Sequence, residues 1–163
     1  MALRIVREAG DDILIKKSKE VKEMTPRTKE LIADMWDTMH DQQGVGLAAV
    51  QVGILKRIFI VETDEENKYT FINPKITLKE GEQTDYEGCL SIPGKVGEVT
   101  RPEHVVIEAL DENMEPFTVD AHELLARAIC HENDHLDGIL YAELCDELLD
   151  AADVAAEEDE YED

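Results

Sequence analysis

The stretch that most constrains this chain is His131-Glu132-Asn133-Asp134-His135, a His-Glu-x-x-His pattern. On a helix, residues four apart lie on one face, so His131 and His135 can offer two imidazole nitrogens to one metal ion. Glu132 follows the first histidine and can reach a metal-activated water as a general base. The pattern therefore predicts a helix that carries a metal site.

The neighbouring residues predict where this helix begins and ends. Asp120 is a good N-cap residue, and Glu123 stands three positions later, as in a capping box. Apolar residues recur at helical spacing between the two ends: Leu124, Leu125, Ala128 and Ile129. Gly138 suits the position just after the last turn. Imidazoles on the apolar face of a helix need polar partners, and metal ligation would supply them.

Length and composition limit the class of protein. A chain of 163 residues with 43% hydrophobic residues predicts one domain with a real core. No apolar run approaches the ~20 residues that span a bilayer, and Met1-Ala2-Leu3-Arg4 lacks the apolar core of a signal peptide. Three scattered cysteines suit reduced thiols better than a disulfide framework. We therefore expect a cytoplasmic protein with no membrane contact.

The charge of the chain is strongly negative and uneven. The formal net charge is −23, which argues against direct binding of nucleic acid or an anionic membrane. Residues 143–163 contain 11 acidic residues and no Lys or Arg. We expect this acidic segment to begin as a docked helix and, beyond about Ala156, to be disordered and solvating. The stripe that predicts the helix consists of Leu140, Leu144, Leu148 and Ala151.

The remaining chain predicts an α+β domain. Thr25-Pro26 is an N-cap followed by proline, so a helix starts there and runs to about Gly44. Strands are expected at residues 57–61, 68–72, 75–78, 104–110 and 116–119. Asn73-Pro74 is expected to be a turn between two of them. The predicted fold has short antiparallel β segments around a central metal-binding helix, with an N-terminal helix and a C-terminal acidic helix or tail.

Three stretches resemble the signature motifs of the peptide deformylase family: GVGLAAVQVG (44–53), EGCLSIPG (87–94) and HENDHLDG (131–138). They occur in the family's order and at roughly its spacing, and the short gap between the first two resembles the bacterial type. The resemblance implies a catalytic domain over residues 1–142, followed by the acidic segment 143–163. It also implies hydrolysis of the N-formyl group from the N-terminal methionine of new polypeptides, with release of formate.

The resemblance implies three metal ligands, Cys89, His131 and His135. Two imidazoles and one thiolate leave a position open for water, which is the mark of a catalytic site. This donor set suits Zn²⁺, Fe²⁺, Co²⁺ or Ni²⁺. The resemblance implies one Fe²⁺ per chain, with the other three ions as substitutes. Cys130 points about 100° around the helix from His131, and we expect it to pack in the core, although the family often has glutamine there.

Three residues are expected to act on the substrate. A bound metal lowers the pKa of water to ~7, and Glu132 takes the proton as this water attacks the formyl carbon. Glu132 then passes the proton to the departing amine. By resemblance, the Gln51 amide and the backbone N–H of Leu90 hold the developing oxyanion, and one such donor is typically worth ~3–4 kcal/mol.

Six residues are expected to contact the substrate: Gly44, Val45, Gly46, Gly88, Leu124 and Ala128. The glycines would let the substrate backbone dock like an added strand. The three apolar side chains would line a pocket for the methionine side chain. Arg127 lies beside that pocket in sequence, and we expect it to pair with an acidic neighbour or with the substrate chain. Asp134 and Arg101 are expected either to support the metal ligands from behind or to be structural.

The predicted partners are nascent formylmethionyl polypeptides, with a transient ribosome contact and a monomeric state. The acidic segment argues against docking on ribosomal RNA. Two other interpretations stay open. A zinc metalloprotease shares the His-Glu-x-x-His pattern but takes a third His or Glu ligand downstream, and no histidine follows His135. A non-catalytic metal-binding or ribosome-associated module would need neither Glu132 nor Gln51.

Overall fold

The computed structural model describes residues 2–162, with side chains through Ala156. Its strands form two antiparallel sheets, one of five strands in the order β1-β2-β3-β6-β7 and one of three in the order β4-β5-β8. The strands are β1 (Gly46–Ala48), β2 (Ile58–Glu62), β3 (Lys68–Glu80), β4 (Gln83–Cys89), β5 (Ile92–Arg101), β6 (His104–Leu110), β7 (Pro116–His122) and β8 (Leu149–Asp150). The helices are α1 (Pro26–Asp41), α2 (Glu123–Leu136) and α3 (Ala151–Glu162). The predicted α+β class with antiparallel strands is confirmed.

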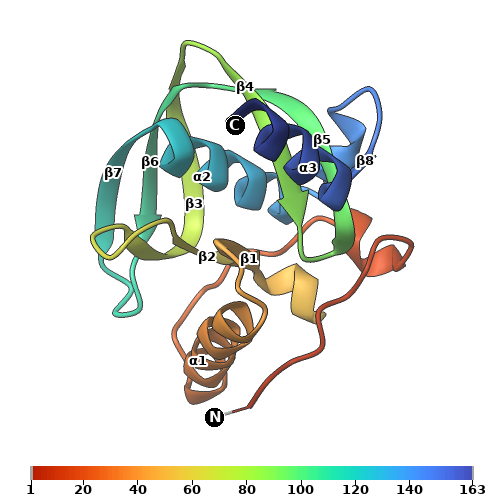
Figure 1. Cartoon of the computed structure of the whole chain (residues 1–163). Coiled ribbons are helices and arrows are strands. Elements are labelled where there is room, and N and C mark those ends of the chain that lie inside the picture. The colour runs from red at the N-terminus through yellow and green to blue at the C-terminus, as the bar shows by residue number, and fades with distance from the viewer. Residues whose placement is uncertain (1, 163) are drawn as a thin grey trace.

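Helix α2 runs through the middle of the molecule, with β3, β6 and β7 on one side and the β4–β5 hairpin on the other (Figure 1). Helix α1 packs on the outer face of β1 and β2, and α3 lies beside β5 (Figure 1). Three short 3₁₀ helices complete the fold: η1 (Asp12–Ile15), η2 (Ala49–Val52) and η3 (Tyr141–Glu143). In the described part of the chain, no helix combines the length and the apolar character that a membrane crossing requires.

Strand β2 explains why helices cover both faces of the large sheet. Successive side chains of a strand point to opposite faces. Ile58 and Ile60 pack in the cluster that α1 covers, whereas Phe59 and Val61 pack in the cluster that α2 covers. All four side chains are fully buried. This strand therefore anchors α1 and α2 to a single sheet, and α2 carries the predicted site.

Helix α1 begins as predicted. Thr25 is the N-cap, and its hydroxyl accepts a hydrogen bond from the Thr28 N–H at 3.1 Å. Pro26 occupies the first helical position, where no backbone donor is needed. The helix ends at Asp41, three residues before the expected end at Gly44.

The start of α2 differs from the prediction. Strand β7 continues through Asp120 to His122, and the helix begins only at Glu123. The predicted N-cap at Asp120 is wrong because His122 still pairs with His104 across the sheet and the Glu123 N–H donates to the Glu103 carbonyl at 2.9 Å. The end agrees with the prediction, since Gly138 follows the helix with φ +76°.

Strand β3 joins two segments that the sequence separates. The expected turn at Asn73-Pro74 is wrong, because Asn73 adopts φ 50° and the register shifts between Ile72 and Lys75 while pairing with β6 continues. The Asn73 side-chain amide binds the backbone of the N-terminal segment at Val21. Its oxygen accepts from the Val21 N–H at 2.8 Å, and its nitrogen donates to the Val21 carbonyl at 2.7 Å.

The β4–β5 hairpin was not predicted from the sequence, which placed residues 87–94 between strands. Its alternation is hard to recognise because β4 has only one buried residue, Glu87. The two strands pair from Gln83–Arg101 to Cys89–Ile92, with a register shift after Glu87. This hairpin places Cys89 at the end of a strand instead of in a loop.

The acidic C-terminal segment folds differently from the predicted stripe. After η3 the chain forms β8, which pairs with Lys95 and Val96 of β5, and α3 begins only at Ala151. Leu144 and Leu148 are exposed, at 47% and 39%. A continuous helix is therefore wrong for residues 143–150. The disorder expected beyond Ala156 concerns residues 157–163, whose side chains lie outside the described residues.

Candidate active site and metal centre

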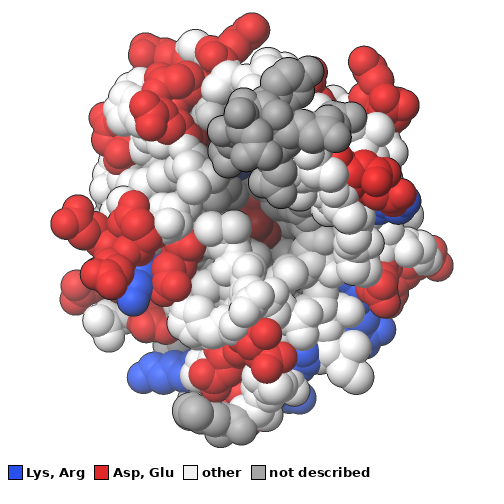
Figure 2. Space-filling model, viewed as in Figure 1, with Lys and Arg blue, Asp and Glu red and all other residues white. Residues whose placement is uncertain are grey.

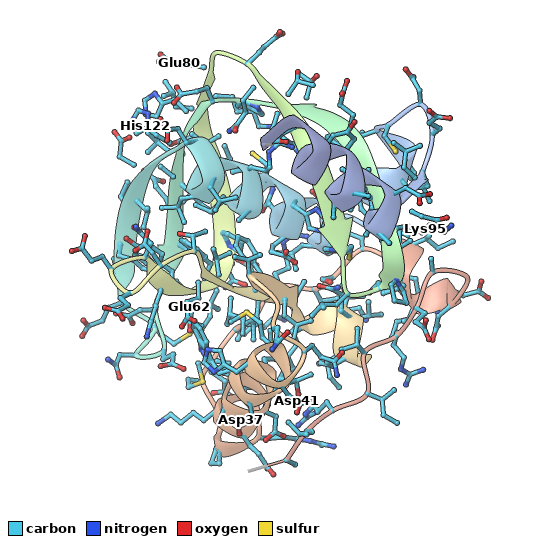
Figure 3. All side chains as sticks on the ribbon, in the orientation of Figure 1. Asp37, Asp41, Glu62, Glu80, Lys95 and His122 are labelled. Carbon is cyan, nitrogen blue, oxygen red and sulfur yellow. The ribbon has the colours of Figure 1, made fainter. Side chains whose placement is uncertain are left out.

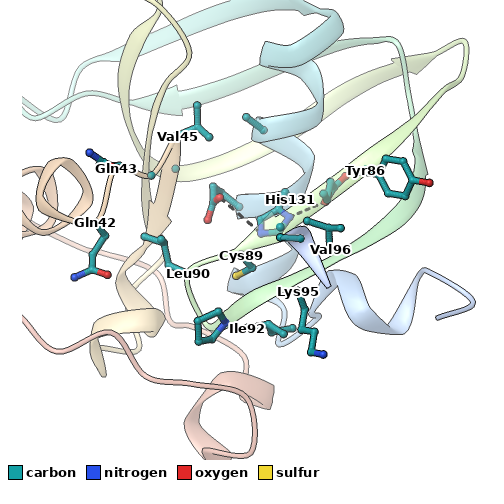
Figure 4. A pocket seen from close by; sticks show the side chains of 18 of the residues that line it. Gln42, Gln43, Val45, Tyr86, Cys89, Leu90, Ile92, Lys95, Val96 and His131 are labelled. Atoms are coloured by element: carbon teal, nitrogen blue, oxygen red, sulfur yellow. Dashed lines mark hydrogen bonds and ion pairs between the residues drawn. The ribbon is translucent and has the colours of Figure 1, made fainter. Parts of the chain in front are cut away.

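Helix α2 and the β4–β5 hairpin bring the three predicted ligands together. One helical turn separates His131 from His135, and their Nε2 atoms lie 3.3 Å apart. Cys89 Sγ lies 3.5 Å from His135 Nε2. All three ligand atoms lie within 4.8 Å of one another. Figure 4 shows Cys89 and His131 facing each other from the hairpin and the helix.

Two neighbours orient the Cys89 side of this cluster. The Ser91 N–H donates to Cys89 Sγ at 3.4 Å. The Gln51 amide oxygen accepts from the Ala48 N–H at 2.9 Å, which turns its NH₂ group toward Ser91 Oγ at 3.0 Å and Cys89 Sγ at 3.5 Å. Gln51 is therefore held with its donors toward the site. The contribution of Ser91 was not predicted, although it lies two residues after Cys89 in the same motif.

Glu87 orients His131, and sequence reasoning also missed it. Its Oε1 lies 2.7 Å from His131 Nδ1, which directs the other ring nitrogen toward Cys89 and His135. Arg101 binds the same carboxylate with two hydrogen bonds of 2.8 and 2.9 Å. Burial alone would raise the pKa of Glu87, but the hydrogen bonds and charges of Arg101 and His131 lower it to about 2. The available signal was that Glu87 is the one charged residue of the 87–94 motif and lies two residues before Cys89.

Arg127 lies at the cleft, where the sequence left two possible partners for its charge, an acidic neighbour or the substrate chain. Its guanidinium pairs with Glu87 at 2.5 Å and donates to the Gln83 carbonyl at 3.2 Å. Of the alternatives that the sequence left open, the structure thus has the acidic neighbour. Arg101 also contacts Asp134 at 2.6 Å, which is compatible with either role expected for the two residues.

Glu132 is buried beside the cluster without a hydrogen-bond partner for Oε1 among the described residues. Its two oxygens lie 3.9 Å from His131 Nε2 and 4.0 Å from His135 Nε2. Burial raises the pKa of Glu132 to about 7, against the lowering effect of the nearby His131. Burial thus disfavours the ionised form of Glu132, and a cation held by the three ligands would favour it.

The electrostatics of the two histidines also fit a cation. Burial lowers the pKa of His131, yet the charges of Glu132 and Cys89 and the hydrogen bond to Glu87 raise it to about 10. The pKa of His135 is instead lowered, first by burial and then by His131. At 3.3 Å the two Nε2 atoms cannot both carry a proton, so the pair presents at least one lone pair next to a thiol and two carboxyl groups. The donor set therefore suits an ion that prefers imidazole and thiolate.

A cleft of about 530 Å³ opens beside the cluster. Figure 2 shows the hollow surrounded mainly by uncharged residues, with acidic atoms visible inside it and further acidic residues toward the outline of this face. The cleft is lined by all six residues expected to contact substrate: Gly44, Val45, Gly46, Gly88, Leu124 and Ala128. Val45 and Leu124 are 46% and 53% exposed, which is high for large apolar side chains. Leu90 also lines the cleft and packs against Gly44.

The fold and the cluster are those of an α+β metallohydrolase, with a candidate Cys-His-His metal site beside an apolar cleft. The polypeptide deformylase family model matches residues 3–150. The chain therefore belongs to the polypeptide deformylase family.

Individual members of the family resemble this chain closely. A peptide deformylase of Lachnoclostridium phytofermentans is 55% identical over 145 residues, which cover 88% of this chain and 89% of that protein. The crystal structure of peptide deformylase from Thermotoga maritima matches with a TM-score of 0.87 at 31% identity, covering 90% of this chain and 100% of that one. Peptide deformylase from Ehrlichia chaffeensis in complex with actinonin matches with a TM-score of 0.86 at 34% identity, covering 100% and 99%.

Membership of this family defines the enzyme at a coarse level. Its members are metal-dependent hydrolases that remove the N-formyl group from newly made polypeptides. The predictions of a hydrolase, of this family and of a role in protein biosynthesis are confirmed. The two alternatives, a zinc metalloprotease and a non-catalytic binding module, are thereby excluded.

Proposed function

We propose that this chain removes the N-formyl group from formylmethionyl peptides, with Glu132 as the residue that moves the proton. The observation that carries this proposal is the position of Glu132. Its carboxylate lies about equally far from His131 and His135, and Oε1 lacks a protein partner among the described residues. The carboxylate is thus available to a water molecule or substrate at the point where the ligands converge.

Cys89, His131 and His135 would hold the metal, and Glu87 would orient His131 from behind. We propose Fe²⁺ as the native ion, one per chain, with Zn²⁺, Ni²⁺ or Co²⁺ as substitutes, because two imidazoles and one thiolate accept all of them. When bound, such an ion acidifies a water molecule and polarises the formyl carbonyl.

Three residues of the chain would take part in the hydrolysis of the formyl amide bond: Glu132 in proton transfer, and Gln51 and Leu90 in binding the oxyanion. Glu132 takes the proton from the attacking water and delivers it to the nitrogen of the departing amine. The Gln51 NH₂ group would donate to the oxyanion that forms on the formyl oxygen, together with the Leu90 backbone N–H. One N–H of the Gln51 amide makes only a long, weak contact of 3.5 Å with Cys89 Sγ. This N–H would be the one that donates to the oxyanion.

The cleft would bind the methionyl end of the substrate. Strand β1 is an edge of the five-stranded sheet and β4 an edge of the three-stranded sheet, so an extended peptide can add a strand there. Leu124, Ala128 and Val45 would surround the methionine side chain. Ala128→Leu is expected to raise the KM for formylmethionyl peptides with little change in kcat, and an unchanged KM would remove Ala128 from the pocket.

The central test measures formate release. The protein is loaded with Fe²⁺ under anaerobic conditions and given a formylmethionyl tripeptide, with the acetylated peptide as the control substrate. We expect formate from the formyl peptide alone and a kcat roughly 10²–10⁴-fold lower in Glu132→Gln. Glu123→Gln, an exposed glutamate on the same helix, is the matched control and should retain full activity.

The outcome separates the parts of the proposal. Full activity of Glu132→Gln with metal bound would refute the role of Glu132, whereas loss of metal from this variant would assign it to the metal site. Because the Ehrlichia chaffeensis relative was crystallised with actinonin, we also expect actinonin to compete with the formyl peptide in this cleft.

A further inference from the structure

A second cluster of metal-binding side chains lies outside the cleft, where β6 begins and β7 ends. It consists of His104, Asp120 and His122. His104 and His122 are direct partners across the β6–β7 ladder. Their imidazole rings stack with centroids 4.2 Å apart and an angle of 6° between the planes. These residues do not line the cleft, and the proposed deformylation does not use them.

Strand geometry places the three side chains next to one another on one face of the sheet. Asp120 and His122 are two residues apart on β7 and share a face, and the opposite face places Ala121 in the core. Asp120 Oδ1 lies 2.8 Å from His104 Nε2 and 3.0 Å from His122 Nε2. Two imidazole nitrogens and one carboxylate oxygen thus converge on the solvent side of the sheet.

Two further carboxylates stand behind the imidazoles. Glu80, the partner of His104 on β3, places Oε2 3.2 Å from His104 Nδ1. Glu103 Oε1 lies 3.6 Å from His122 Nδ1. A carboxylate on the far nitrogen of a histidine fixes the ring and increases its basicity as a ligand, which is the usual arrangement around metal-bound histidines. Figure 3 shows Glu80 and His122 at the same corner of the molecule, far from Lys95 beside the cleft.

We propose that His104, Asp120 and His122 bind a second divalent transition-metal ion, of the Zn²⁺ type, on this outer face. Two imidazoles and one carboxylate are a common Zn²⁺ donor set, with water completing the coordination. Each ring must tilt so that the ion lies in its plane. The His122 ring has room to do so, since its side chain is 56% exposed, and that of Asp120 is 64% exposed. The His104 side chain is only 18% exposed and is held by Glu80 and Asp120, so His122 and Asp120 would make most of the movement.

An ion at this position would join β6 to β7 immediately before α2 begins at Glu123. His122 lies nine residues before His131, about 13 Å along a helix axis. The second ion would therefore be structural, fixing the strand from which the helix with the first site starts. The alternative is that the two histidines serve only as ion-pair partners of the carboxylates.

A titration with Co²⁺, used in place of Zn²⁺ under anaerobic conditions, distinguishes the two sites. Only the first contains a thiolate, so only its ion gives a sulfur-to-cobalt charge-transfer band. We expect equilibrium dialysis to find two ions per chain, while the charge-transfer band saturates at one. His122→Gln and Asp120→Asn should each reduce the stoichiometry to one ion and leave the band unchanged.

His40→Gln is the matched control, because His40 is a surface histidine paired with Glu62 at 3.3 Å outside the cluster, and this variant should keep two ions. His122 makes no side-chain capping bond to α2, so replacing it removes no helix cap. One ion per chain in the unmodified protein, or a second ion that survives both substitutions, would overturn the proposal. A missing charge-transfer band would count against the first site alone.

Discussion

His131 Nδ1 lies 2.7 Å from Oε1 of Glu87, which precedes it by 44 residues and comes from the opposite side of the site. The same carboxylate binds Arg101 and Arg127, so one buried acidic group holds two arginines and a predicted metal ligand. This contact links the stability of the hairpin to the orientation of the helix. It also provides a direct test of the metal site.

Replacing Glu87 by glutamine should weaken metal binding. The amide cannot accept the His131 N–H as strongly. It also leaves Arg127 without its charge partner and Arg101 with Asp134 alone, so we expect the metal affinity to fall about 10–100-fold. Competition with a chromophoric chelator measures this affinity directly. Glu98→Gln, on the exposed face of β5, is the control and should bind like the unmodified protein. Equal affinities for both variants would mean that Glu87 only stabilises the hairpin.

Gly46 should be required for the position of Glu132. A Cβ atom at Gly46 would lie 2.5 Å from Glu132 Oε2 and 2.8 Å from its Cγ. Gly46→Ala must therefore displace the carboxylate, and a shift of about 1 Å typically costs ~10²-fold in rate. We expect kcat to fall by this order while metal content stays at the level of the unmodified protein. Loss of metal in parallel with activity would instead indicate that the substitution disturbs the ligands.

Removing the side-chain donor of Gln51 should reduce catalysis without removing metal. Gln51→Met keeps the approximate shape but cannot donate to an oxyanion, so we expect kcat to fall about 10²–10³-fold. Ser91→Ala is the informative comparison, because it removes the hydroxyl that accepts from Gln51 and leaves the donor in place. A comparable loss in both variants would assign Gln51 a structural role through Ser91.

The sequence predicted the parts of the site that local patterns encode. The spacing of His131 and His135 alone places two imidazoles on one face, and the motif around Cys89 identified the third residue of the cluster. The role of Glu87 was missed because its partners Arg101, Arg127 and His131 are 14, 40 and 44 residues away. Only the tertiary fold brings such residues together, and local sequence patterns do not predict contacts over these separations.

The fold was predictable to a similar extent. Capping residues located α1, and short runs rich in Val, Ile and Phe located β2 and β6, because each signal lies within a few residues. The start of α2 was misplaced because cross-strand pairing of His122 with His104 outweighs the capping preference of Asp120. The C-terminal segment was misread because Leu149 and Asp150 pair with β5, and a helical stripe in the sequence contains no information about that partner.

Cys89 and Cys130 should differ in reactivity according to their surroundings. Burial raises the pKa of Cys130 to about 11, so at pH 8 roughly one molecule in a thousand carries the thiolate. Cys130 packs in the core cluster, as the sequence predicted. In chelated protein we expect iodoacetamide to modify Cys89 and to spare Cys130, and bound metal should protect Cys89. Peptide mass spectrometry identifies the modified sites. Modification of Cys89 at equal rates with and without metal would exclude it as a ligand.

Asp34 should link the N-terminal arm, residues 2–11 before η1, to α1 in a pH-dependent way. It accepts hydrogen bonds from the Ala2 N–H at 3.1 Å and from Arg4 at 3.0 Å. Burial raises its pKa, but these hydrogen bonds and the charge of Arg4 prevail and lower the pKa below the ordinary value of 3.8. Because these bonds favour the ionised form, we expect Asp34→Asn to lower the free energy of unfolding by about 1.5–3 kcal/mol at pH 7.

The sign of the pH dependence follows from the lowered pKa of Asp34. As pH falls, the unfolded chain binds this proton before the folded protein does, so the stabilisation is complete above about 3.8 and is lost as pH falls through the lower folded value. Urea unfolding at a series of pH values should therefore show the difference between the unmodified protein and Asp34→Asn shrinking below pH 3.8. Glu30→Gln, exposed on α1, is the control. A difference that persists unchanged to pH 2 would show that Asp34 stabilises the arm by packing and not by charge.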